Sequence, residues 1–214
     1  MIKAIIFDFD GVILESATIK TQAFGDVVSE YPIEQAKEFV DYHMSHMGIS
    51  RHVKFKYFIE EILHEEYSED KEKVLADKFS NIVFERVMTC EYVSGAREFL
   101  EDNYDKYDFY IASGTPHEEM MTITDGRDLT KFFKEIYGSP MKKEEIIDKI
   151  MNEHKYRNDE IVFVGDASTD LNAAMAKCVY FVGRNTPDNV DVFRNVDFKV
   201  DNLKEIERII GDLD

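Results

Sequence analysis

Six short apolar runs, separated by segments with helical periodicity, are the feature that most constrains the fold of this 214-residue chain. The runs are rich in β-branched and aromatic residues, and such continuous runs are typical of strands buried on both faces of a parallel sheet. Alternation of these strands with helices predicts βα units, and therefore an α/β fold with a Rossmann-like parallel sheet. The six runs occupy residues 2–8, 107–113, 133–139, 160–166, 178–183 and 197–200.

One long segment, residues 15–91, interrupts this alternation. It contains no comparable strand-like run and a single proline, Pro32. Apolar residues near its end recur at helical spacing, which indicates an amphipathic helix. We therefore expect an all-helical domain at residues 15–91, inserted into an α/β core that consists of residues 1–14 and 92–214. The residues with helical spacing are Val74, Leu75, Phe79, Ile82 and Val83.

The composition excludes several classes of partner. The chain has 44 acidic and 26 basic residues, and a formal charge of −18 argues against binding to nucleic acid or to an anionic membrane surface. The two cysteines, Cys90 and Cys178, have no metal-ligand spacing and suit a reducing cytoplasm better than a disulfide framework. The sequence has no apolar stretch of about 18 residues. We expect a cytoplasmic protein with no membrane segment and no obligate protein partner.

Polar clusters follow four of the predicted strands. Asp8 and Asp10 follow the first, and the clusters "ASGTP" (112–116), "GSPMKK" (138–143) and "GDASTD" (165–170) follow the next three. Ligands of parallel α/β sheets bind outside the carboxyl ends of the strands, where these loops converge. Each cluster alone is a weak signal, because acidic turns, helix caps and solvated lysines are common. Their order along the chain, however, predicts one shared site.

With Asp-x-Asp, Ser, Lys and Asp in this order, and a helical insertion after the first motif, the chain resembles the haloacid dehalogenase-like hydrolase superfamily over nearly its whole length. It is similar to the subgroup that includes phosphoglycolate phosphatases and β-phosphoglucomutases. The resemblance implies that Asp8 is the nucleophile and that Asp10 is the general acid and base. Ser113 would contact the transferred phosphoryl group, with Gly114 and Thr115 as further substrate contacts.

The resemblance also implies a Mg²⁺ cofactor and a lysine that neutralises charge. Asp8, Asp166 and the backbone carbonyl of Asp10 would bind Mg²⁺, and Asp170 would support the metal shell or the lysine. The stretch "GSPMKKEEI" offers two lysines for this role. We favour Lys143 because similar sequences place two variable positions between "GSP" and the lysine, and Lys142 is the alternative.

Phosphoryl transfer needs these residue types. An aspartate can accept a phosphoryl group to give an aspartyl phosphate, and Mg²⁺ prefers oxygen ligands. A second aspartate would protonate a leaving alcohol, whereas a halide leaving group needs no proton, so dehalogenation is disfavoured. We therefore expect a Mg²⁺-dependent phosphatase acting on a small phosphate monoester. A sugar phosphomutase that uses the same aspartates, and a binding module without catalysis, are the alternatives.

A basic island in the helical insertion bears on the substrate. No acidic residue occurs from Tyr42 to Ile59, and Arg51 and Lys54 lie within this stretch. They are predicted to bind a second anionic group of the substrate. The equally weighted alternative is a helix face whose basic residues meet solvent or pair with glutamates. His43 and His46 are three residues apart, and without a third ligand nearby a structural role is favoured over metal binding.

Overall fold

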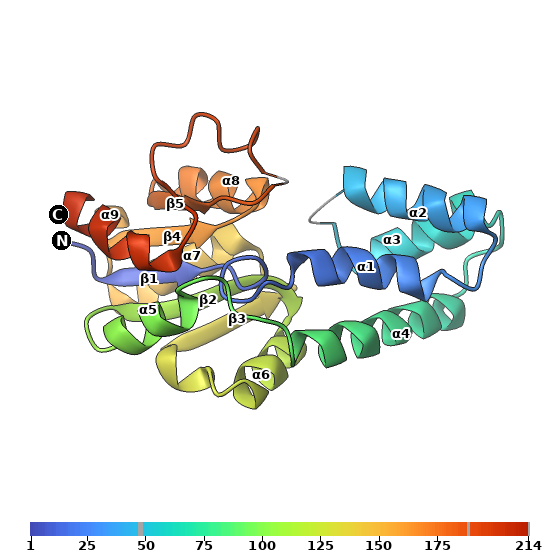
Figure 1. Cartoon of the computed structure of the whole chain (residues 1–214), viewed down its shortest axis with the longest axis horizontal. Coiled ribbons are helices and arrows are strands. Elements are labelled where there is room, and N and C mark those ends of the chain that lie inside the picture. The colour runs from blue at the N-terminus through green and yellow to red at the C-terminus, as the bar shows by residue number, and fades with distance from the viewer. Residues whose placement is uncertain (47–48, 188, 214) are drawn as a thin grey trace. The chain divides into compact units, whose positions relative to one another are not determined.

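The chain forms two compact units in the computed structural model, which describes residues 1–46, 49–187 and 189–213 (Figure 1). The core unit comprises Met1–Glu15 and Cys90–Asp214, and the helical unit comprises Ser16–Thr89. The boundaries predicted from the sequence fell after residues 14 and 91. Each unit has its own buried apolar interior, so each is described by itself below.

The core unit contains one parallel sheet. In the described residues the strand order is β3-β2-β1-β4-β5-β6, so β1 is central, with Ile5 opposite Phe109 of β2 and Val162 of β4. The predicted α/β fold with a parallel sheet is confirmed, and each strand overlaps one of the six apolar runs. The strands are β1 (Ala4–Phe7), β2 (Asp108–Pro116), β3 (Glu135–Ser139), β4 (Ile161–Gly165), β5 (Tyr180–Arg184) and β6 (Lys199–Val200).

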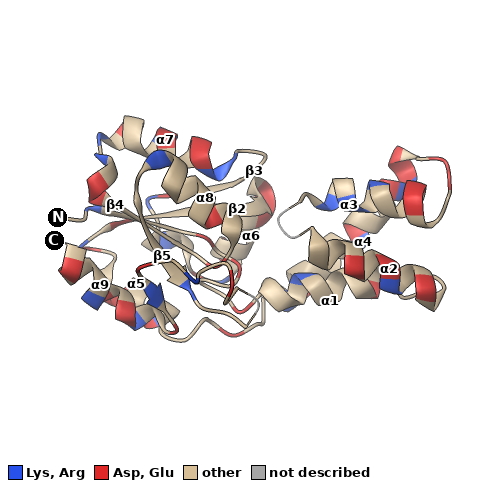
Figure 2. Cartoon of the chain, turned by 90° about the horizontal axis from the view of Figure 1, so that it is seen from above, with Lys and Arg blue, Asp and Glu red and all other residues tan. Residues whose placement is uncertain are grey.

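Helices cover both faces of this sheet, with α7 and α8 on one side and α5 and α9 on the other (Figure 2). On the first side, Ile146 and Ile150 of α7 join Ile6 and Phe163 in a buried cluster. On the other side, the Phe7 ring contacts the Phe99 ring of α5 edge-on, with 6.2 Å between the ring centroids. The helices are α5 (Ala96–Asn103), α6 (His117–Gly126), α7 (Lys143–His154), α8 (Ser168–Lys177) and α9 (Ile206–Leu213). Short 3₁₀ turns occupy Thr130–Phe132, Asn158–Glu160 and Leu203–Glu205.

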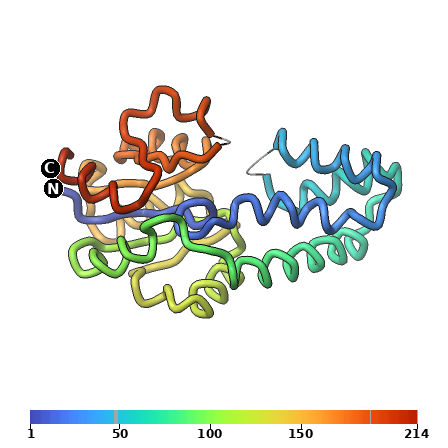
Figure 3. The backbone as a smooth tube through the Cα atoms, in the orientation of Figure 1, coloured from blue at the N-terminus to red at the C-terminus, as the bar shows by residue number. Residues whose placement is uncertain are grey.

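The backbone trace shows the two chain termini side by side on the core unit (Figure 3). The two chain segments that lead into and out of the helical insertion are also neighbours. The Glu15 amide donates to the Glu91 carbonyl at 3.0 Å, and the Val93 amide donates to the Ile13 carbonyl at 3.0 Å. The chain therefore leaves the core unit and returns to it at one place.

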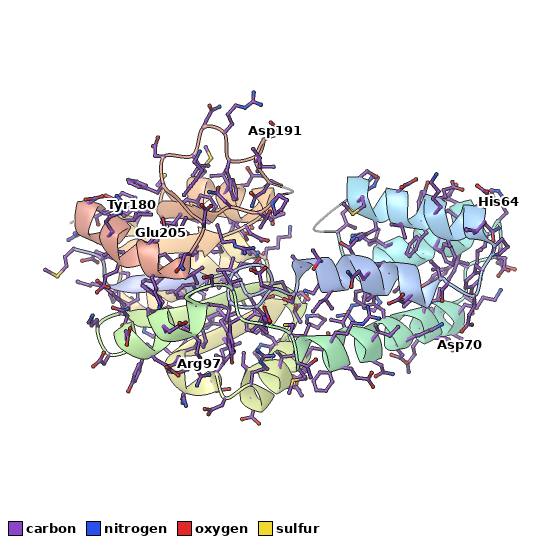
Figure 4. The ribbon with its side chains drawn as sticks, in the orientation of Figure 1. His64, Asp70, Arg97, Tyr180, Asp191 and Glu205 are labelled. Carbon is purple, nitrogen blue, oxygen red and sulfur yellow. The ribbon has the colours of Figure 1, made fainter. Side chains whose placement is uncertain are left out.

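The helical unit is built around aromatic rings. Phe24, Phe39, Phe55 and Phe79 are all at most 4% exposed and lie in ring contact with one another. The elements are α1 (Ala17–Val27), α2 (Ile33–Ser45), α3 (Arg51–Tyr57), a π-helical turn (Phe58–Ile62) and α4 (Glu69–Val87). His64 and Asp70 mark the two sides of the connection between the π-helical turn and α4 in Figure 4.

The buried stripe of α4 differs from the predicted set of residues: Val74 is exposed, Ile82 is half-buried, and Val87 joins the stripe. Leu75, Phe79, Val83 and Val87 are buried at a spacing of four residues, whereas Val74 is 66% exposed. Four-residue steps follow one face of a helix, and Val74 lies about a quarter turn away from that face. Its inclusion in the predicted stripe was therefore wrong.

A polar network lies inside the aromatic interior of the helical unit. Lys54 is 2% exposed, and its Nζ donates to His43 Nδ1 at 2.8 Å. Because Nδ1 accepts this bond, the proton of a neutral His43 lies on Nε2, which contacts Thr21 Oγ1 at 3.1 Å. Lys54 Nζ also lies 5.0 Å from the centroid of the Phe24 ring, a cation–π distance. Burial lowers the pKa of Lys54 to about 8, and burial followed by the Lys54 charge lowers the pKa of His43 to about 4.

The structure shows where the acidic residues and the two cysteines of the chain lie. The acidic residues are spread over helices of both units (Figure 2). Cys90 is partly buried and Cys178 is exposed, and neither forms a disulfide within the described residues. Among the described residues, no helix combines the length and the apolar character needed to cross a membrane.

Lys54 generates a prediction about pH and stability. Between pH 8 and about 10.5 the unfolded chain holds a proton on Lys54 that the folded chain has lost, so raising the pH through this window favours the folded state. We expect the free energy of unfolding of the wild type to rise over this window relative to that of Lys54→Met, measured by urea unfolding. Lys56→Met is the control, because the Lys56 side chain is 53% exposed on the same helix. A difference between wild type and Lys54→Met that does not change with pH would contradict the prediction.

Candidate active site

Asp8 lies directly beyond the carboxyl end of the central strand. Its backbone amide donates to the Val164 carbonyl of β4 at 2.9 Å, which extends the β1–β4 pairing by one residue. Its Oδ1 accepts a hydrogen bond from the Phe9 amide at 2.8 Å. Asp8 is only 7% exposed, so its carboxylate is held in one orientation at the edge of the sheet.

Asp10 is brought to the same edge by a tight turn. Gly11 has φ of +77°, a left-handed conformation that favours glycine, and the Ile13 amide donates back to the Phe9 carbonyl at 2.9 Å. Asp10 Oδ2 accepts a hydrogen bond from Thr115 Oγ1 at 3.0 Å. The two predicted catalytic carboxylates therefore have separate partners.

The end of β2 supplies the neutral polar groups of the site. Ser113 is 1% exposed, and its Oγ accepts a hydrogen bond from the Thr115 amide at 3.1 Å. Gly114, between them, is exposed, and a Cβ built on it would meet nothing within 4 Å. The strand end thus presents a buried hydroxyl beside an open backbone segment.

Lys143 is the cation of the site. It is the first residue of α7, and its Nζ lies 3.1 Å from Asp8 Oδ2 and donates to Asp170 Oδ1. Burial lowers the pKa of Lys143, but the carboxylates of Asp8 and Asp170 more than offset this and raise it above the usual value. Lys142 is exposed, and its amide donates to Glu145 Oε2 at 3.2 Å. Between the two lysines considered, the structure places Lys143 beside Asp8.

Asp170 is fully buried, and each of its oxygens has a protein partner. Oδ1 accepts from Lys143, and Oδ2 accepts from the Ala167 amide at 3.0 Å. Its side chain packs on Gly165, where an added Cβ would lie only 2.3 Å from Asp170 Cβ. Asp170 therefore holds the lysine and the loop after β4, which was one of the two roles predicted for it.

Asp166 completes the group of carboxylates. Oxygens of Asp8, Asp166 and Asp170 lie within 4.8 Å of one another. Burial, and then the Asp8 and Asp170 carboxylates, raise the pKa of Asp166 to about 8; burial likewise raises the pKa of Asp8 to about 7 against the effect of Lys143. Negative charge in this group exceeds the charge of the one neighbouring lysine. An oxygen donor set of this kind fits a hard divalent cation such as Mg²⁺.

The sequence matches the family model of haloacid dehalogenase-like hydrolases over residues 5–183. The chain belongs to this family. Among curated proteins, no sequence match was found.

Solved structures of other proteins have a fold similar to that of this hydrolase. A protein described as a predicted phosphoglycolate phosphatase from Haemophilus somnus 129pt has 19% identity and a TM-score of 0.77, with 98% of each chain covered. A β-phosphoglucomutase from Clostridium difficile has 19% identity and a TM-score of 0.74, covering 100% of this chain and 97% of its own. The HAD-hydrolase YfnB from Bacillus subtilis, solved with bound magnesium, has 15% identity and a TM-score of 0.74, with 98% and 99% covered. At these identities the likeness shows the fold.

Two predicted substrate contacts of the hydrolase, Arg51 and Lys54, lie in the helical unit. Arg51 donates to Ser80 Oγ, and its guanidinium carbon is 5.1 Å from the centroid of the Phe79 ring. Lys54 is enclosed with His43 and Thr21 as described above. Both cations have partners within the helical unit, but these partners are a histidine, a serine and aromatic rings rather than the solvent or glutamates of the alternative considered for the basic island. Their role in substrate binding stays a prediction. His43 has both ring nitrogens engaged, as a structural role requires.

One contact of the site was missed by sequence reasoning. The Asn189 side chain, 4% exposed, donates to the backbone carbonyl of Asp166 at 2.7 Å. It lies in the loop after β5, and the only available signal was that this loop also follows a parallel strand. Asparagine is common in loops, so the residue type alone did not distinguish it.

The contact between Gly165 and Asp170 generates a second prediction. In Gly165→Ala the new methyl group would overlap Asp170, and we expect the free energy of unfolding to fall by about 1–3 kcal/mol, as in other overpacked cores. Chemical denaturation of the metal-free protein measures this. Gly211→Ala in α9 is the control, because a Cβ there meets nothing within 4 Å and alanine favours helix. Equal stability of the wild type and Gly165→Ala would show that Asp170 has room to move.

Proposed function

We propose that this hydrolase is a Mg²⁺-dependent phosphatase that acts on a small phosphate monoester through an aspartyl-phosphate intermediate. One observation carries the proposal. Asp8 is buried beside Lys143, and a second carboxylate, Asp10, is held separately by Thr115 at the same edge of the sheet. One carboxylate is therefore placed to react while the other moves protons.

In the first step, a carboxylate oxygen of Asp8 attacks phosphorus and the bond from phosphorus to the alcohol oxygen breaks. Asp10, protonated at this stage, donates its proton to the leaving alcohol. The Thr115 hydroxyl keeps Asp10 directed to the site. Ser113 and the backbone at Gly114 and Thr115 are proposed to bind the phosphoryl oxygens.

In the second step, water attacks phosphorus of the aspartyl phosphate. Asp10, now a carboxylate, takes a proton from this water, and the Asp8–phosphorus bond breaks to release inorganic phosphate and restore Asp8. Lys143 neutralises the charge that Asp8 and the phosphoryl group share, and Asp170 holds its ammonium in place.

Asp8, Asp166 and the backbone carbonyl of Asp10 are the proposed Mg²⁺ ligands. A bound Mg²⁺ would offset the repulsion between the nucleophile and the phosphate. The raised pKa values of Asp8 and Asp166 are consistent with this assignment, because they reflect first the burial of the two carboxylates and then the negative charge of the neighbouring aspartates. The partner is proposed to be a free small molecule, and two cysteines that form no disulfide within the described residues suit a cytoplasmic setting.

A sugar phosphomutase is the second candidate function. It would use the same two aspartates but return the phosphoryl group to the sugar, and the C. difficile β-phosphoglucomutase shares the fold. Release of inorganic phosphate from a phosphorylated sugar, compared with formation of its isomer, separates the two functions.

Asp8 provides the direct test of the proposal. Asp8→Asn is nearly isosteric but replaces the nucleophilic carboxylate by an amide, and we expect phosphate release to fall by about a thousandfold or more. The variant should stay folded, since Lys143 keeps its ion pair with the buried Asp170. Initial rates with a panel of phosphate monoesters, together with circular dichroism, measure both properties. Asp105→Asn, an exposed aspartate in the core unit, is the matched control. Wild-type turnover by folded Asp8→Asn would exclude Asp8 as nucleophile.

Metal exchange tests the cofactor. We expect treatment with EDTA to abolish phosphate release, Mg²⁺ to restore it, and Ca²⁺ to inhibit the Mg²⁺ enzyme. Ca²⁺ binds oxygen at about 2.3–2.6 Å with a loose shell, whereas Mg²⁺ binds at about 2.0–2.1 Å in an octahedron, so Ca²⁺ would misplace the nucleophile and the phosphate. Initial rates with p-nitrophenyl phosphate report all three results. Full activity after chelation would rule out the Mg²⁺ requirement.

A further inference from the structure

Asn189 lies in the loop after β5, a segment marked by Asp191 in Figure 4, and its side chain bonds at three points. Nδ2 donates to the Asp166 carbonyl at 2.7 Å and to the Arg184 carbonyl at 2.8 Å, while Oδ1 accepts from the Thr186 amide at 2.9 Å. The bonds use both amide protons and the oxygen. An amide buried to 4% exposure and bonded in this way fixes the backbone around it.

The loop that carries Asn189 is itself anchored in the core unit. Phe193, four residues further on, is 1% exposed, and its ring contacts Phe181 of β5 with 5.4 Å between the centroids. The Phe193 amide donates to the Asn189 carbonyl at 3.1 Å. Asn189 therefore ties the Asp166 backbone to a fixed part of the sheet.

The position of Asp166 explains why its backbone needs to be held by hydrogen bonds. It follows the last residue of β4, and its carboxylate lies in a group whose members repel one another. The neighbouring Asp170 is held by Lys143 and the Ala167 amide. Asp166, by contrast, is held through its backbone carbonyl, which accepts a hydrogen bond from the side-chain amide of Asn189 in the loop after β5.

We propose that Asn189 is a positioning residue that orients Asp166 for divalent-metal binding and thereby sets the metal affinity of the site. The inference rests on the proposed function, because it takes Asp166 to be a metal ligand. Without the Asn189 amide, the carbonyls of Asp166 and Arg184 lose a buried donor and the Asp166 backbone gains freedom. Loss of a group that orients a metal ligand typically weakens metal affinity by about 10–100-fold.

The test measures metal binding directly. Mn²⁺ is titrated into wild type, Asn189→Ala and Asn189→Leu, with free Mn²⁺ followed by electron paramagnetic resonance and Mg²⁺ used as competitor. Leucine keeps the branched shape of asparagine and is larger, whereas alanine is smaller, and neither has a side-chain donor, so agreement between the two variants separates the hydrogen bonds from packing. Asn185→Ala, in the same loop as Asn189, is the control, since the Asn185 side-chain amide donates to Asp201 beyond β6 at 2.8 Å and not to Asp166. Thermal unfolding of the metal-free proteins shows which variants are folded.

We expect the Mn²⁺ dissociation constant to rise by about 10–100-fold in both Asn189 variants and to stay within about twofold of wild type in Asn185→Ala. In phosphatase assays the half-saturating Mg²⁺ concentration should rise in parallel, with a smaller loss of kcat at saturating Mg²⁺. If the folded variants have a lower unfolding temperature but an unchanged Mn²⁺ dissociation constant, Asn189 has only a structural role. This result would overturn the inference and leave the proposed function intact. Absence of Mn²⁺ and Mg²⁺ binding to wild type would overturn the metal assignment of the proposed function together with the inference.

Discussion

The contact of one buried ammonium with two buried carboxylates organises the site. Lys143 reaches Asp8 and Asp170 from the first residue of α7, so the start of that helix, the end of β1 and the start of α8 must be held in register. Breaking a buried ion pair by removing one partner leaves an uncompensated charge, which is strongly destabilising. The arrangement of three elements around the mouth of the sheet therefore depends on this contact.

The parallel sheet explains why sequence reasoning located so much of the site. Asp8, Ser113 and Asp166 each lie at or just beyond a strand end, and parallel strands bring their carboxyl ends to one edge. Strand runs are local patterns, so the sheet and the convergence of the four polar clusters could be predicted from the sequence, whereas the role of each carboxylate was implied by the resemblance to haloacid dehalogenase-like hydrolases. The preference for Lys143 over Lys142 rested on the same resemblance, because the residues alone do not show where α7 begins or which side chain faces Asp8. The Asn189 contact also depends on tertiary geometry.

In the helical unit, the sequence did not predict the surroundings of the key side chains. Its basic island was identified by charge in the sequence, yet charge along the chain does not show what a side chain will meet in the fold. Lys54 lies among aromatic rings with a histidine as its hydrogen-bond acceptor, and Arg51 contacts a serine and a phenylalanine ring. Helical periodicity predicted the helices of this unit, but a polar residue on their buried side cannot be recognised from its type.

The hydrogen bonds between the segments that lead into and out of the insertion give the chain a modular character. Glu15 with Glu91, and Ile13 with Val93, hold the two ends of the insertion together, and all four residues belong to the core unit. Because its two ends are joined in this way, the insertion of residues 16–89 connects to the core unit as a surface loop would. Loop closure entropy grows slowly, by about 0.6 kcal/mol for each doubling of length, so the core tolerates inserts of very different size. Evolution or protein engineering can therefore exchange the whole insert while the sheet and its carboxylates stay unchanged.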